Sequence, residues 1–164
     1  MGQRTPTNRK SSGSDPFAAA LRLLTYRDRS TTELATKLHD RDFQKEEIES
    51  VLIRCQELGY LNDERFAFTR ARALVNSGRA VGIRALNEMR RFGLDQGLVE
   101  RALAEAESEA DLPLLLKDIQ QRKFPGFDFN EATQKEKNRV LSFFQRRGFP
   151  ISMILDVLKS NETK

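Results

Sequence analysis

One pattern of apolar residues occurs three times in this chain, as LATKLHDRDFQKEEIESVL at 34–52, ALNEMRRFGLDQGLVERAL at 85–103 and VLSFFQRRGFPISMILDVL at 140–158. With Phe43, Leu94 and Phe149 as anchors, apolar residues recur nine and five positions before each anchor, and five, eight and nine positions after it. All fifteen flanking positions are apolar, although apolar residues make up only 38% of the chain. The agreement indicates an internal repeat.

The offsets within the repeat are those of a pair of α-helices. Positions four apart before the anchor share one helix face, and positions three and four apart after it share one face of a second helix. A further helix precedes each pair, and we expect these helices at about 16–28, 62–77 and 108–122. The sequence therefore predicts an all-α chain in which three tandem three-helix repeats form an elongated, curved array, at 15–59, 60–107 and 108–160. A closed helical bundle is the alternative.

Residue types at the expected helix ends agree with this reading. Asp15 followed by Pro16 is typical of an N-cap and a first helical turn. Ser30 and Glu33 have the spacing of a capping box. A glycine in the left-handed conformation can end three of the helical runs, at Gly59, Gly93 and Gly148.

Several features bear on the compartment. Residues 1–14 carry basic residues but no apolar stretch, so we predict a disordered basic tail and no secretory signal. No apolar run approaches the roughly 20 residues that span a membrane. The single cysteine, Cys55, cannot form an internal disulfide bond. We therefore expect a cytoplasmic, monomeric protein that does not bind membranes.

The sequence contains no constellation typical of catalysis or metal binding. The lone histidine, His39, falls at the end of an expected helix, and Cys55 adjoins the apolar face of another. The glycines are too scattered for a P-loop or a dinucleotide-binding turn. We expect a binding protein without enzymatic activity, cofactor or metal.

Charge is distributed in blocks along the chain. The net charge of +4 is too small to indicate nucleic acid by itself. However, residues 60–93 hold seven arginines against three acids, and residues 94–118 hold seven acids against two basic residues. Such blocks favour orientation toward a charged partner, and an ordinary solvated surface is the alternative.

Arginines in the basic block recur at intervals of seven. Because seven residues make nearly two helical turns, side chains at this spacing return to the same side of a helix. We interpret the set as an arginine ridge that binds carboxylates or phosphates, at Arg65, Arg72, Arg79, Arg84 and Arg91, with Arg90 beside them. For any single arginine, a solvent-facing position opposite the core is the alternative.

The chain resembles a known family, the bacterial RecX regulatory proteins, which modulate the RecA recombinase. The stretch YRDRS at 26–30, which leads to Glu33 and Leu34, is similar to the start of the family's first repeat. The stretch GYLNDERFA at 59–67 is similar to its most recognisable segment, and 82–94 matches more loosely. Phe92 stands where the family commonly has a basic residue.

The resemblance implies a helical repeat protein that lodges in the groove of the RecA–DNA filament. It would inhibit ATP hydrolysis, strand exchange and filament extension, and so act in homologous recombination, DNA repair and the SOS response. We expect the contact surface for RecA or DNA to comprise Arg27, Arg29, Arg65, Arg72, Arg79, Arg84, Arg90 and Arg91.

Three residues of the second motif are expected to be structural. Asp63 or Asn62 can cap the next helix, Tyr60 or Leu61 can pack on its first turn, and Phe66 can enter the core. The alternative function is a general nucleic-acid-binding helical module, whose contacts with single- or double-stranded DNA would be sensitive to salt.

Overall fold

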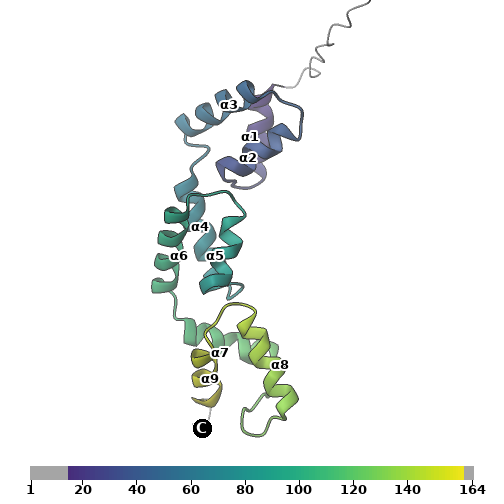
Figure 1. Ribbon diagram of the computed structural model, residues 1–164, viewed down its shortest axis with the longest axis vertical. Helices are drawn as coiled ribbons and strands as arrows, with labels where there is room; N and C mark the ends of the chain where they lie inside the picture. Colours follow the sequence, from purple (N-terminus) through teal and green to yellow (C-terminus); the bar gives the residue numbers. More distant parts are fainter. Residues whose placement is uncertain (1–14, 161–164) are drawn as a thin grey trace, which may run out of the picture. The chain divides into compact units, whose positions relative to one another are not determined.

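The computed structural model describes residues 15–160, and every regular element within that range is an α-helix (Figure 1). The prediction of an all-α repeat fold is confirmed, and the basic tail predicted at 1–14 lies outside the described residues. The helices of the described part are α1 (Pro16–Tyr26), α2 (Thr31–His39), α3 (Lys45–Glu57), α4 (Asp63–Asn76), α5 (Gly82–Arg90), α6 (Gln96–Glu109), α7 (Leu112–Lys123), α8 (Gln134–Gln145) and α9 (Ile151–Ser160).

The repeated apolar positions form the interior. The three copies of the pattern correspond to the pairs α2–α3, α5–α6 and α8–α9. Of the fifteen flanking positions, all are buried except Leu52, which is half-buried. The anchors Phe43 and Phe149 are buried at the turns, and Leu94 is half-buried. The offsets found in the sequence therefore mark the core-facing side of each helix pair.

Side-chain caps set the helix starts. The Asp15 carboxylate accepts hydrogen bonds from the backbone N–H groups of Phe17 and Ala18 at the start of α1. Helix α7 begins at Leu112 rather than near 108, because α6 continues to Glu109 and the Asp111 carboxylate then accepts from the N–H of Leu114.

The described residues divide into two compact units, one that ends at Asp63 and one that begins at Glu64. In the first unit, α1, α2 and α3 enclose one core that contains Leu34, Leu38 and Phe43. In the second unit, buried residues from all six helices α4 to α9 join a single core. The second and third predicted repeats therefore share an interior, and the division into three domains stays a prediction.

A close backbone contact joins the α4–α5 turn to the α8–α9 turn within the second unit. The N–H of Val81 donates to the carbonyl of Arg147 at 2.8 Å. Gly148 follows with φ of +92°, and a Cβ at this position would overlap the carbonyl oxygen of Val81. Only glycine therefore fits where these two turns meet.

We expect Gly148→Ala to destabilise the second unit more than Gly126→Ala. Both glycines have positive φ, so each alanine should cost about 1 kcal/mol of backbone strain. Nothing lies within 4 Å of a Cβ at Gly126, whereas overlap with Val81 at Gly148 should add about 2 kcal/mol. Urea denaturation would measure both, and equal losses would contradict this account of the contact.

Candidate functional site

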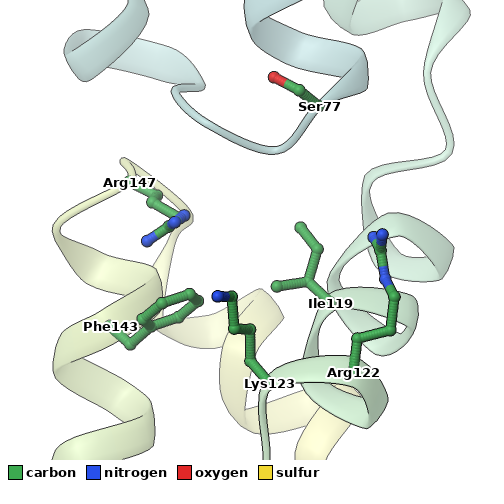
Figure 2. Close-up of a pocket in the computed structure, with 6 residues that line it drawn as sticks. All are labelled: Ser77, Ile119, Arg122, Lys123, Phe143 and Arg147. Carbon is green, nitrogen blue, oxygen red and sulfur yellow. The ribbon is translucent and has the colours of Figure 1, made fainter.

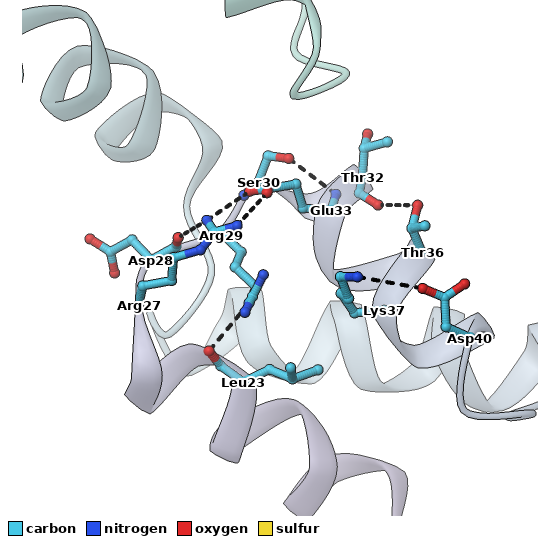
Figure 3. Close-up of polar contacts among 10 residues, drawn as sticks. All are labelled: Leu23, Arg27, Asp28, Arg29, Ser30, Thr32, Glu33, Thr36, Lys37 and Asp40. Carbon is cyan, nitrogen blue, oxygen red and sulfur yellow. Dashed lines mark hydrogen bonds and ion pairs between the residues drawn. The ribbon is translucent and has the colours of Figure 1, made fainter. Parts of the chain in front are cut away.

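The motif at 26–33 folds into a compact polar cluster at the start of α2 (Figure 3). Arg27, extended just after α1, donates to both carboxylate oxygens of Glu33, with Nη2–Oε1 at 2.7 Å and Nη1–Oε2 at 3.3 Å. Glu33 also accepts from the N–H of Ser30, while Ser30 Oγ accepts from the N–H of Glu33. The predicted capping box is thus formed, and its glutamate neutralises Arg27.

These contacts shift the ionisation of both partners. The hydrogen bond with Glu33 is the largest effect on Arg27 and raises its pKa. Burial alone would raise the pKa of Glu33. The hydrogen bonds that its carboxylate accepts from Arg27 and Ser30 outweigh burial, so the pKa is lowered. The pair is therefore charged at neutral pH and satisfied within the chain.

Arg29 differs from the expectation of an exposed contact residue. Its side chain is covered, with only 8% of the residue exposed, and Nε donates to the carbonyl of Leu23 at 3.3 Å. Burial, followed by the neighbouring charge of Arg27, lowers its pKa. Arg29 ties the loop to the end of α1, so we do not retain it as part of a partner-binding surface.

The second motif surrounds the start of α4. Oδ1 of Asp63 accepts from the N–H of Thr31 at 2.7 Å, so this carboxylate serves the start of α2 rather than the helix that Asp63 begins. Tyr60 is half exposed. Phe66 is buried, and its ring meets that of Phe92 edge-to-face at 5.1 Å. Phe92, unusual for the resembled family, thus has a packing role in this chain.

Two arginines of the proposed ridge pair with acids. Arg72 of α4 binds Glu105 and Glu109 of α6, with Nε to Glu109 Oε2 at 3.0 Å. The hydrogen bond lowers the pKa of Glu109 and raises that of Arg72. Arg84 of α5 pairs with Glu88 one turn later, at 3.2 Å. Part of the basic block is therefore neutralised within the chain.

The seven-residue interpretation is wrong for Arg79. Helix α4 ends at Asn76, and Arg79 lies in the following turn, where its N–H donates to the carbonyl of Leu74. Its side chain therefore does not continue the α4 face that carries Arg65 and Arg72. Arg65 and Arg72 themselves are both exposed on α4.

Three further arginines of the basic block lie at the two ends of α5. Arg79 precedes this helix, Arg90 is its last residue, and Arg91 is its C-cap. All three are exposed, and in the described part of the chain none has a carboxylate within ion-pairing distance. The sequence alone did not predict which arginines pair with acids. The acidic block at 94–118 could have indicated such pairs, because it supplies Glu105 and Glu109, the partners of Arg72.

Other chemistry is sparse in residues 15–160. No group of three or more histidine, cysteine, aspartate or glutamate side chains within that range is placed to hold a metal ion. Over the same range, no helix combines the length and apolarity needed to cross a bilayer. Cys55 is completely buried, and burial raises the pKa of its thiol, which makes it unreactive.

Known proteins are similar to this chain over most of its length. The model of the RecX first three-helix domain matches residues 17–55. The regulatory protein RecX of Syntrophotalea carbinolica is 38% identical over 141 residues, which cover 86% of this chain and 92% of that protein. The regulatory protein RecX of Trichlorobacter lovleyi is 35% identical with the same coverage.

Two solved structures show the same fold. The crystal structure of RecX from Lactobacillus salivarius has a TM-score of 0.65 at 20% identity and covers 88% of this chain and 93% of that one. A second crystal structure of a regulatory protein RecX has a TM-score of 0.69 at 20% identity, with 87% and 70% covered.

We expect Glu33→Gln to destabilise the first unit by about 1 kcal/mol at pH 7, the usual cost of losing a helix cap. Because folding lowers the pKa of Glu33, its charge stabilises the fold above the unfolded value of about 4.3. That contribution disappears as the pH falls through the lower folded value, so the two proteins should converge in acid.

Urea denaturation at several pH values would measure this difference. Glu49→Gln is the control, because Glu49 is exposed and meets Lys45 only at 3.7 Å, a pair worth less than about 1 kcal/mol. A difference for Glu33→Gln that does not change with pH would contradict the assignment.

Proposed function

This chain belongs to the RecX family of regulatory proteins, and we propose that it binds the RecA–DNA filament and inhibits RecA. Inhibition would extend to ATP hydrolysis, strand exchange and filament extension. The observation that supports the proposal most is the extent of the similarity, which covers 86% of this chain and 92% of the length of both relatives. A protein that acts in this way works in the cytoplasm, in recombination, DNA repair and the SOS response.

The exposed face of α5 is the surface that we propose for the contact. Ile83, Asn87 and Arg90 are spaced four and three apart, so they share one side of the helix, and Arg91 adjoins them. Ile83 is 65% exposed, which is unusual for so large an apolar side chain. Exposed apolar and arginine side chains together are typical of protein–protein interfaces.

Arginine suits a filament that presents both protein carboxylates and DNA phosphates. The guanidinium group binds either anion through two parallel hydrogen bonds. Arg79, Arg90 and Arg91 are available for this because no carboxylate in the described residues pairs with them. Arg72 and Arg84 would first have to leave their glutamate partners.

We expect the protein to slow RecA-driven ATP hydrolysis on single-stranded DNA at ratios near or below one protein per RecA. Replacing both Arg90 and Arg91 by glutamate should raise the concentration required for half-inhibition about tenfold, as the loss of an interface hot spot does. Arg101→Glu is the control, since Arg101 is exposed on α6, outside this face. If saturating wild-type protein changes neither ATP hydrolysis nor filament length, the proposal is wrong.

A general nucleic-acid-binding module is the second candidate, favoured by the seven arginines at 60–93. The ion pairs of Arg72 and Arg84 weigh against it, because they leave fewer charges for phosphates. We therefore expect weak, salt-sensitive binding to bare DNA and tighter binding to RecA-coated DNA. Fluorescence anisotropy on the same labelled strand, with and without RecA, would compare the two. Equal affinities would favour the general module.

A further inference from the structure

The second unit contains a pocket of about 370 Å³ that the proposed function does not use (Figure 2). Its volume falls within the roughly 300–1,000 Å³ of small-molecule sites. Three segments far apart in the sequence contribute to it. The α4–α5 turn supplies Ser77, α7 supplies Ile119, Arg122 and Lys123, and the end of α8 with the following turn supplies Phe143 and Arg147.

Three cations surround this space. In Figure 2, the heads of Lys123 and Arg147 lie near the ring of Phe143, and Ile119 lies between Lys123 and Arg122. The guanidinium of Arg147 stacks on the Phe143 ring at 3.8 Å, and Nε of Arg122 donates to a carbonyl of its own helix. Within residues 15–160, none of the three cations has a carboxylate within 4.0 Å.

A simpler role for these three cations is to stabilise the C-terminal ends of helices, but this role accounts for only part of their charge. Helices α7 and α8 both end at the pocket, and each C-terminus carries a partial charge of about −0.5. The two ends together offset about one of the three positive charges. The two helix ends therefore do not match the three positive charges, of which Arg147 is the one that is partly buried.

The positive charge of Arg147 is partly buried. Burial, followed by the charge of neighbouring Arg146, lowers its pKa. A guanidinium stays protonated even so, because its ordinary pKa lies far above neutrality. A partly buried charge without a counter-ion is unfavourable, and a bound anion would relieve it.

We propose that this pocket binds a phosphate group, carried either by a nucleic-acid strand or by a free nucleotide. Two guanidinium groups and one ammonium group match the oxygens of a phosphate, and the apolar side chains of Ile119 and Phe143 suit an attached sugar or base. The hydroxyl proton of Ser77 is donated to the carbonyl of Leu74, so the three cations supply the hydrogen bonds to the phosphate.

The composition of this part of the chain agrees with such a ligand. Residues 119–164 hold nine basic residues against five acids, which would draw a polyanion toward the pocket. None of the lining residues belongs to the α5 face proposed for the filament. The pocket is therefore a separate site, and its test requires no recombinase.

The test uses the full chain and three probes: a short fluorescein-labelled oligothymidylate, thymidine monophosphate and inorganic phosphate. Fluorescence anisotropy at low salt measures the first, and titration calorimetry measures the other two. Replacing both Arg122 and Lys123 by glutamine should weaken binding of at least one probe about tenfold. Lys117→Gln, on an exposed residue of the same helix outside the pocket, should change it less than twofold (about 0.4 kcal/mol).

The probes distinguish the source of the phosphate. If the pocket variants weaken binding of the oligothymidylate alone, the site binds a nucleic-acid strand. If they weaken binding of thymidine monophosphate or inorganic phosphate, the site binds a free phosphate ligand. The single variant Lys123→Gln, at an exposed side chain, serves if a thermal melt shows that the double variant is unfolded. The proposal is overturned if no probe binds, or if Lys117→Gln weakens binding as much as the pocket variants do. Either result leaves the proposed regulation of RecA standing.

Discussion

Helices of nine to fourteen residues are marginal on their own in water, because the cost of starting a helix is not recovered over so few hydrogen bonds. Each helix here therefore depends on burying one apolar side against its neighbours. The recurring core positions provide that side in all three copies, and the buried anchors Phe43 and Phe149 close two of the turns. The polar faces are left free to vary, which lets copies of one unit carry different surfaces.

The two units satisfy this constraint differently. The first encloses its core with three helices and fixes its loops with polar contacts, notably Arg27 with Glu33 and Asp63 with Thr31. The second joins six helices around one core, with the Val81–Arg147 hydrogen bond between its turns. Its ion pairs join α4 to α6 through Arg72. The polar contacts of both units thus hold helices that the apolar pattern has already brought together.

The sequence predicted the repeat well because helix pairs have fixed periodicities, so the offsets around Phe43 translate directly into buried faces. It predicted the surface less well. Burial of Arg29 depends on how a loop folds back on α1, and neutralisation of Arg72 depends on α6 lying beside α4. A seven-residue spacing also has no geometric meaning beyond the end of a helix, as Arg79 shows. The pocket could not be predicted, because its residues are brought together only by packing.

Cys55 gives this chain a reporter of its own dynamics. It is the single cysteine of the sequence and is completely covered in the core of the first unit. A thiol reacts with an alkylating reagent only as the exposed thiolate, so labelling has to proceed through molecules in which this core has opened. The labelling rate therefore reports the opening of the core of the first unit, while the second unit, which lacks a thiol, gives no signal.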